Sequence, residues 1–166
     1  MTMSAGKQKF SIVSLGCARN LVDSEVMAGL LEQHHYDMVQ EPEDADIVLV
    51  NTCGFIEAAK TESLDTIIEI SRLKEEGKIK KLVVAGCLAQ RYPRELAKEL
   101  PEVDLFIGTG EVPKIVEILQ RQEADAKIRQ YVGIPQYLYD HATPRVRATP
   151  SYTAFLKVSE GCDHKC

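Results

Sequence analysis

Four short runs of consecutive apolar residues most constrain the fold of this chain. They occupy residues 10–15, 46–51, 81–85 and 103–107, and longer amphipathic stretches separate them. Near-continuous apolar sequence is typical of strands buried on both faces of a parallel sheet, because strands with one wet face alternate instead. Residues 36–39 are predicted as one more short strand. The alternation of strand and helix patterns predicts an α/β fold, an open parallel sheet flanked by helices with right-handed crossovers.

The stretches between these runs carry helix signals. An apolar stripe follows Asn20, which is predicted as the N-cap of the first helix. A second stripe predicts a helix over about residues 57–76, closed by Gly77. Pro93 and Pro113 each stand where a first-turn proline would begin a further helix. Together these signals place a helix after each of the main strands.

The periodic pattern of apolar residues fades after about residue 120, which suggests that one domain ends there. Residues 1–9 are expected to be a disordered N-terminus, and residues 10–120 to form the α/β domain. Residues 121–150, with several prolines, are predicted to be a linker whose interspersed tyrosines dock on that domain. Residues 152–158 are apolar enough to predict another strand. Residues 151–166 are therefore interpreted as the beginning of a second, truncated domain.

Composition narrows the function classes. The chain has 166 residues, with 20 Lys and Arg against 25 Asp and Glu, which gives a net charge of −5. That balance disfavours nucleic-acid binding by this segment alone. No apolar run reaches the length of a membrane helix, and the first ten residues lack the apolar core of a secretory signal. A cytoplasmic, reducing location is predicted, so the five cysteines are expected to be metal ligands or reactive thiols rather than disulfides.

Three of the cysteines occupy equivalent places in the predicted sheet. Cys17, Cys53 and Cys87 each follow a predicted strand, each is next to a glycine, and they are 36 and 34 residues apart. All carboxyl ends of parallel strands meet at one edge, which is where open α/β sheets bind ligands. We therefore expect these three side chains to converge on one small object.

Thiolates are a soft ligand set that suits zinc, copper(I) or an iron–sulfur cluster. A structural zinc site normally has four ligands, often from C-x-x-C pairs, and no such pair exists here. His34 and His35 are predicted to lie solvated at the far end of the first helix. An iron–sulfur cluster fits three separated ligands better and leaves one iron open. The alternatives are a zinc or purely structural domain, in which each cysteine is only a small buried apolar residue.

The other two cysteines, Cys162 and Cys166, lie in the sequence GCDHKC. Their spacing is the first half of C-x-x-x-C-x-x-C, the cluster-binding loop of radical S-adenosylmethionine enzymes. The third cysteine would fall three residues beyond Cys166, outside the given sequence. His164 is interpreted as a loop residue. Dinucleotide-binding, phosphate-loop and nucleophile-elbow motifs are not completed anywhere in the chain.

Four strings of this sequence resemble the methylthiotransferase family of radical S-adenosylmethionine enzymes. They are SLGCARNLVDSEVMAGLL, VNTCGFIEAAKTESLDTI, VVAGCLAQRYP and VSEGCDHKC. The runs after Cys17 and Cys53 look like the branch that modifies an aspartate of ribosomal protein S-twelve. The tRNA adenosine branch is the alternative, and the acidic balance disfavours it. The resemblance covers the chain from Phe10 onward.

The resemblance implies a two-cluster enzyme. In that family the N-terminal domain holds one 4Fe–4S cluster through three cysteines, which match Cys17, Cys53 and Cys87. A radical barrel holds a second 4Fe–4S cluster, and Cys162 and Cys166 match its first two ligands. Reductive cleavage of S-adenosylmethionine there gives a radical that attacks the β-carbon of the aspartate, and the first cluster is thought to hold the sulfur.

The same resemblance sets expectations for partners and activity. Ribosomal protein S-twelve is the expected protein substrate, whereas the reductant and the sulfur donor stay open. No membrane partner is expected. The chain as given is expected to be inactive on its own, because it lacks the rest of the barrel. A non-catalytic iron–sulfur or zinc-binding module stays the alternative from a different functional class.

Overall fold

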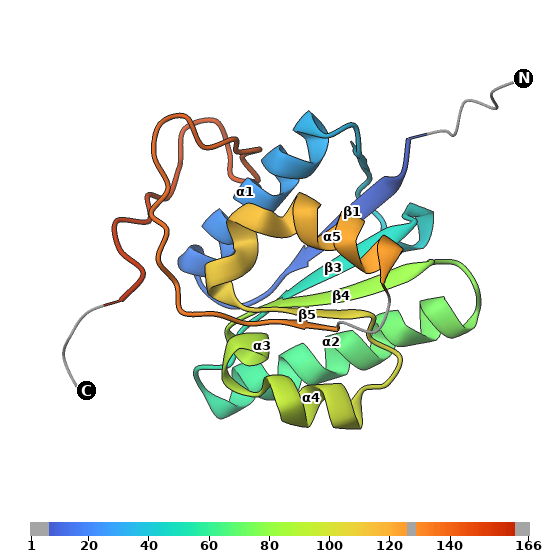
Figure 1. Ribbon diagram of the computed structural model, residues 1–166. Coiled ribbons are helices and arrows are strands. Elements are labelled where there is room, and N and C mark those ends of the chain that lie inside the picture. Colours follow the sequence, from blue (N-terminus) through green and yellow to red (C-terminus); the bar gives the residue numbers. More distant parts are fainter. Residues whose placement is uncertain (1–6, 126–128, 162–166) are drawn as a thin grey trace, which may run out of the picture.

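The computed structural model describes residues 7–125 and 129–161, which build one open sheet of six parallel strands between two layers of helices (Figure 1). The strand order is β2–β1–β3–β4–β5–β6. The strands are β1 (Lys9–Ser14), β2 (Asp37–Met38), β3 (Ile47–Thr52), β4 (Lys81–Gly86), β5 (Leu105–Ile107) and β6 (Gln130–Tyr131). The predicted α/β fold with an open parallel sheet is confirmed, and the five predicted strands before residue 120 begin and end within two residues of their expected bounds.

Helices cover both faces of the sheet. They are α1 (Ala18–Gln33), α2 (Glu57–Glu75), α3 (Cys87–Arg91), α4 (Pro93–Glu99) and α5 (Ile115–Ala124), with 3-10 turns η1 (Pro42–Asp44) and η2 (Thr109–Lys114). Helices α1 and α5 lie on one face, and α2, α3 and α4 lie on the other (Figure 1). No helix among the described residues is long and apolar enough to cross a membrane.

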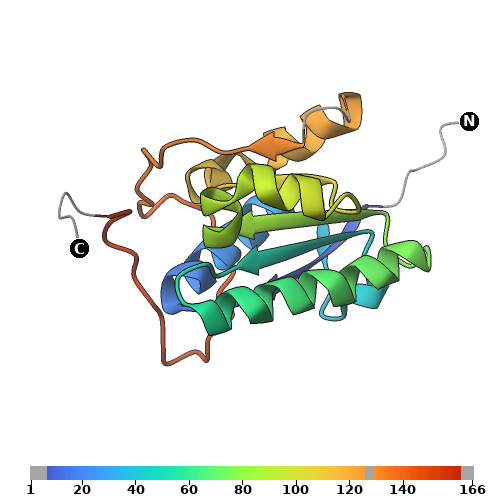
Figure 2. The same cartoon turned by 90° about the horizontal axis from the view of Figure 1, so that it is seen from below.

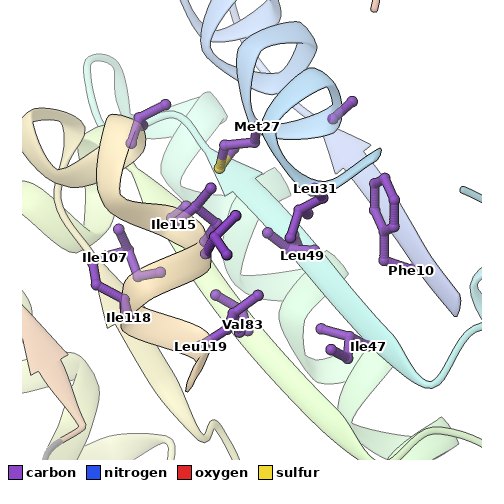
Figure 3. Close-up of a cluster of buried hydrophobic side chains, with 14 of the residues drawn as sticks. Phe10, Met27, Leu31, Ile47, Leu49, Val83, Ile107, Ile115, Ile118 and Leu119 are labelled. Carbon is purple, nitrogen blue, oxygen red and sulfur yellow. The ribbon is translucent and has the colours of Figure 1, made fainter. Parts of the chain in front are cut away.

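Successive residues of the central strands feed two separate cores. Ile47 and Leu49 of β3 pack in the cluster under α1 and α5, whereas Val48 and Val50 pack in the cluster under α2 and α4. Figure 3 shows the first cluster, in which side chains of α1 and α5 meet those of the strands. Each fully buried aliphatic side chain contributes about 1.5–3 kcal/mol of transfer free energy. The near-continuous apolar runs in the sequence follow from this two-sided burial.

Two local helix predictions were wrong, and two were confirmed. Asn20 is not an N-cap: Cys17 occupies that position, and Asn20 lies within the first turn of α1. Pro113 lies inside η2, so a 3-10 turn precedes α5 and the helix begins only at Ile115. Pro93 does begin α4, and Gly77 follows the end of α2 with a φ of +74°.

The region after α5 differs from the prediction in two ways. Strand β6 lies inside the predicted linker and pairs with β5. With two residues, this strand is too short to give a recognisable pattern in the sequence. The strand predicted over residues 152–158 is not present in the described part of the chain. Its backbone finds no neighbouring strand, and Arg145 Nη1 donates instead to Phe155 O at 2.8 Å. Figure 2 shows this segment passing the end of the sheet to which the arrowheads point.

Candidate metal centre at the carboxyl edge of the sheet

The three strand-end cysteines lie at one edge of the sheet. Cys17 lies three positions after the end of β1 and is exposed, Cys53 directly follows β3 and is buried, and Cys87 directly follows β4 and is half-buried. Strands β1, β3 and β4 are neighbours in the sheet. The predicted shared edge is therefore confirmed, while the role of these thiols as metal ligands stays a prediction.

Gly16 lets the first two cysteine loops approach each other. Its φ is +87°, and a Cβ placed there would lie 2.5 Å from Cys53 Cβ and 3.0 Å from Cys53 Sγ. No other residue type fits this contact without displacing the thiol, because both the backbone conformation and the space exclude a side chain. The glycine that precedes Cys17 thus creates the space for Cys53.

Asn20 joins the ends of all three strands. Its side chain is buried, and Nδ2 donates to Leu15 O at 3.1 Å and to Thr52 O at 2.7 Å. Its Oδ1 accepts a hydrogen bond from Cys87 Sγ at 3.5 Å. One amide on α1 therefore fixes the backbone after β1 and at the end of β3, and it orients the thiol after β4. Sequence reasoning missed this role because two of the partners are 32 and 67 residues away.

A second buried amide lies directly beneath the edge. Asn51 Nδ2 donates to Asn20 O at 2.7 Å and to Ser24 Oγ at 2.9 Å. Its Oδ1 has no hydrogen-bond partner among the described residues. That oxygen points at Gly86, where an added Cβ would lie 2.4 Å away. Buried oxygens without partners are rare and often mark functional sites.

The loop after Cys53 is held by two helices. Cys53 N donates to Ser63 Oγ at 3.1 Å, and Ser63 Oγ donates back to Cys53 O at 3.0 Å. Arg91 Nη1 donates to Gly54 O at 2.8 Å. The next side chain, Phe55, is 83% exposed. The backbone around Cys53 is thus rigidly placed, and an apolar side chain projects beside it.

The three thiols of the edge influence one another electrostatically. Burial raises the pKa of the Cys87 thiol, and the neighbouring Cys53 and Cys17 side chains raise it further, against a smaller opposing effect of Arg19. Sulfurs whose negative charges repel one another gain from a metal placed between them, and its binding releases their protons. The donor set therefore fits a thiophilic metal group.

The thiols do not form a closed cage for a single ion. Within residues 7–125 and 129–161, no group of three His, Cys, Asp or Glu residues lies close enough to hold a metal ion. A cavity of about 220 Å³ lies beside Cys17, between the first turn of α1 and Phe155.

Cys162, His164 and Cys166 lie outside the described residues. His34 and His35 are exposed after the end of α1, as predicted.

Comparison with known proteins gives consistent matches. Residues 9–108 match the family described as Uncharacterized protein family UPF0004. A protein of Syntrophotalea carbinolica named ribosomal protein uS12 methylthiotransferase RimO is 51% identical over 163 residues, which are 98% of this chain and 36% of that protein. Proteins of the same name from Trichlorobacter lovleyi and Bdellovibrio bacteriovorus are 53% and 51% identical, over 96% and 98% of this chain and 36% of each relative. The chain thus spans about 36% of the length of these curated relatives.

Proposed function

The chain belongs to the UPF0004 family, and on that premise we propose that it is part of a methylthiotransferase in which Cys17, Cys53 and Cys87 hold a 4Fe–4S cluster. The relatives named as uS12 methylthiotransferases are about half identical to it over nearly its whole length. We propose ribosomal protein uS12 as the substrate of the whole protein. The activity belongs to that longer protein, because this chain spans about 36% of those relatives.

One observation supports the cluster most strongly. Three cysteines follow three neighbouring parallel strands; Cys53 lies against Gly16, and the Cys87 thiol donates to Asn20. The carboxyl edge of an open parallel sheet is where such folds bind ligands. Three soft thiol ligands suit iron and sulfide better than a hard cation.

The residues around the thiols supply orientation. Asn20 accepts a hydrogen bond from the Cys87 thiol, Ser63 holds the backbone of Cys53, and Gly16 provides space beside Cys53. Three protein ligands leave one iron of a cubane without a protein ligand, and that iron is the place for the sulfur to be transferred. Phe55, exposed beside Cys53, offers an apolar contact to whatever approaches this edge.

The remaining parts of the proposal concern residues and steps outside the described structure. We propose that Cys162 and Cys166 begin the ligand set of a second 4Fe–4S cluster, which binds S-adenosylmethionine. The target atom is the β-carbon of an aspartate in uS12. The enzyme works in the cytoplasm, with a low-potential electron donor and a reduced sulfur source as co-reactants.

Anaerobic reconstitution of this chain with iron and sulfide tests the first cluster. We expect about four iron atoms per chain and broad absorption at about 400 nm. Cys17→Ser is expected to lose more than half of the iron while the far-ultraviolet circular dichroism is unchanged, because Cys17 is exposed. Cys53→Ala is expected to lose the iron as well, whereas Ser71→Ala, a buried change on α2 away from the edge, keeps it.

Two results would contradict this assignment. One is a single tightly bound zinc per chain in the isolated protein; the other is full iron content in Cys17→Ser. The substrate is tested with the full-length enzyme, S-adenosylmethionine and a reductant. Mass spectrometry is expected to find one methylthio group in place of one hydrogen on uS12 and none on tRNA, whereas the reverse result assigns the enzyme to the tRNA branch.

A further inference from the structure

Two carboxylates of α1 are buried, and their partners come from the far end of the chain. Asp23 and Glu25 are 3% and 1% exposed. Asp23 pairs with Lys157, and Glu25 pairs with Arg145, at sequence separations of 134 and 120 residues. Removing ionised groups from water is costly unless the partners are well placed. Buried charges of this kind therefore identify a contact whose geometry is specified, and not an incidental one.

Lys157 is the centre of this contact. Its side chain is 3% exposed, and Nζ lies 2.8 Å from Asp23 Oδ1 and 2.6 Å from Glu160 Oε1. Tyr139 Oη donates to the same oxygen of Asp23 at 2.7 Å, and burial raises the pKa of this phenol, so it stays protonated. The ammonium also lies 5.2 Å from the centre of the Tyr139 ring. The single cation is thus enclosed by two carboxylates and one aromatic face.

The same segment reaches the residues beside Cys17. Arg19, two positions after Cys17, donates through Nη2 to Glu160 O at 2.9 Å, and this nitrogen lies 3.7 Å from the Glu160 carboxylate. Glu160 is two positions before Cys162 in the sequence. The first turn of α1, which begins after Cys17, therefore binds the segment that leads to Cys162.

Glu25 fixes the upstream part of the segment. Its Oε2 accepts from Arg145 Nε at 2.6 Å, its Oε1 accepts from Ala148 N at 2.7 Å, and its backbone oxygen accepts from Val146 N at 2.9 Å. Gly29, one helical turn later, lets the segment touch the helix, because a Cβ there would lie 2.5 Å from Arg145 N. The segment is therefore seated on α1 at two places.

We propose that Asp23 and Lys157 form a positioning clamp that holds residues 157–160, which precede Cys162 in the sequence, against the helix that begins after Cys17. The clamp would couple the group of Cys17, Cys53 and Cys87 to the group of Cys162 and Cys166. This inference rests on the proposed function, in which each of the two groups of cysteines holds a cluster. The clamp acts through the segment and touches neither substrate nor cysteine. An apolar pair could stabilise the same contact without buried charge, but the paired charges also specify one register of the segment on the helix.

The test uses the full-length protein with Lys157→Met, with Lys7→Met as the matched control, because Lys7 makes an exposed ion pair with Asp37. Hydrogen exchange of amides 146–157 is expected to accelerate about tenfold in Lys157→Met and to stay unchanged in the control. With both clusters reconstituted and reduced, the spin–spin interaction in the electron paramagnetic resonance spectrum is expected to weaken at unchanged iron content. Turnover is expected to fall about tenfold, with the KM for uS12 unchanged.

The clamp and the proposed function are contradicted by different results. Wild-type protein that binds no cluster contradicts the proposed function, and hydrogen exchange alone then decides whether the segment is clamped. Unchanged exchange and unchanged spin–spin interaction in Lys157→Met overturn the clamp while leaving the clusters assigned. Asp23→Asn provides a second variant if Lys157→Met fails to fold; it keeps Glu160 as a partner for the cation and is expected to show a smaller change in the same direction.

Discussion

The two ends of the strands in this sheet are built differently. At the amino end, carboxylates satisfy the groups around them: Asp46 accepts from Lys9 N at 2.9 Å and pairs with Lys80 at 2.7 Å. Asp104 in the same way accepts from Leu82 N at 2.8 Å. These contacts join the starts of neighbouring strands, so this end of the sheet is closed by its own side chains.

The carboxyl end is built from glycine-containing loops and exposed side chains instead. Gly16 and Gly86 both have positive φ angles, and Asn51 Oδ1 lacks a partner among the described residues. Cys17 and Phe55 are exposed there. A chain that joins its strands through carboxylates at one end and presents thiols at the other separates stability from chemistry. The comparison predicts that substitutions at the amino end change stability alone.

The largest expected effect concerns the fit at the carboxyl end. Gly86→Ala places a Cβ 2.4 Å from Asn51 Oδ1 and 2.5 Å from Thr52 O, at a φ of +96°. We expect the free energy of unfolding to fall by about 3–5 kcal/mol, measured by urea denaturation. Gly77→Ala is the control, because Gly77 has a φ of +74° but nothing within 4 Å of the new Cβ.

That control is expected to lose only about 1 kcal/mol, the cost of the backbone conformation itself. Equal losses at the two glycines would mean that the space around Asn51 is not constrained. The carboxyl end would then be no more tightly packed than an ordinary helix terminus.

Asp104→Ala tests the closed end. Its carboxylate also pairs with Lys74 Nζ at 2.6 Å, and Leu82, whose N–H it accepts, is fully buried. Leaving that N–H without an acceptor is expected to lower the free energy of unfolding by about 2–3 kcal/mol. Asp104→Asn keeps an acceptor and is expected to lose about 1 kcal/mol. Iron loading of the reconstituted protein is expected to stay unchanged in both variants, and a loss of iron would break the separation of the two ends.

Asp46→Asn gives the smallest effect and a dependence on pH. The hydrogen bond from Lys80 and then that from Lys9 N hold the pKa of Asp46 below its ordinary value of 3.8. A depressed pKa in the folded state contributes stability that is present above the unfolded value and is lost as pH falls through the folded value. We expect Asp46→Asn to cost less than about 1 kcal/mol at neutral pH, because the pair is partly exposed.

Denaturation of this variant and of the wild type at several pH values below about 4 checks the sign. Their stabilities are expected to converge as the pH falls. Lys80→Met removes the larger cause and is expected to move the convergence toward the ordinary pKa of Asp46. A gap that widens in acid would show that the carboxylate is not held in its charged form.

Patterns local in sequence predicted the sheet, and contacts distant in sequence escaped prediction. The strands around Leu49 and Val84 were readable because burial on both faces requires continuous apolar residues. The shared edge of Cys17, Cys53 and Cys87 followed from the parallel topology alone. Whether these thiols bind metal is not a property of the pattern, and it stays a prediction.

The misses have a common physical cause. Asn20 resembles an N-cap in the sequence, but its hydrogen bonds are decided by strands that arrive later in the chain. Lys157 lies in a run that predicts a strand, yet its ammonium is buried between Asp23 and Glu160. A lysine in an apolar run carries no signal that carboxylates elsewhere will enclose it.

The shortness of the outermost strands, β2 and β6, has a consequence for how the molecule behaves in a crowded solution. Each has only two residues, whereas β3 and β4, with six residues each, lie inside the sheet. An exposed edge strand presents unpaired backbone N–H and C=O groups with which another polypeptide can pair, and a strand of two residues presents very few of them. The described sheet therefore resists the addition of further strands at its two edges, even without prolines or charges on the edge strands.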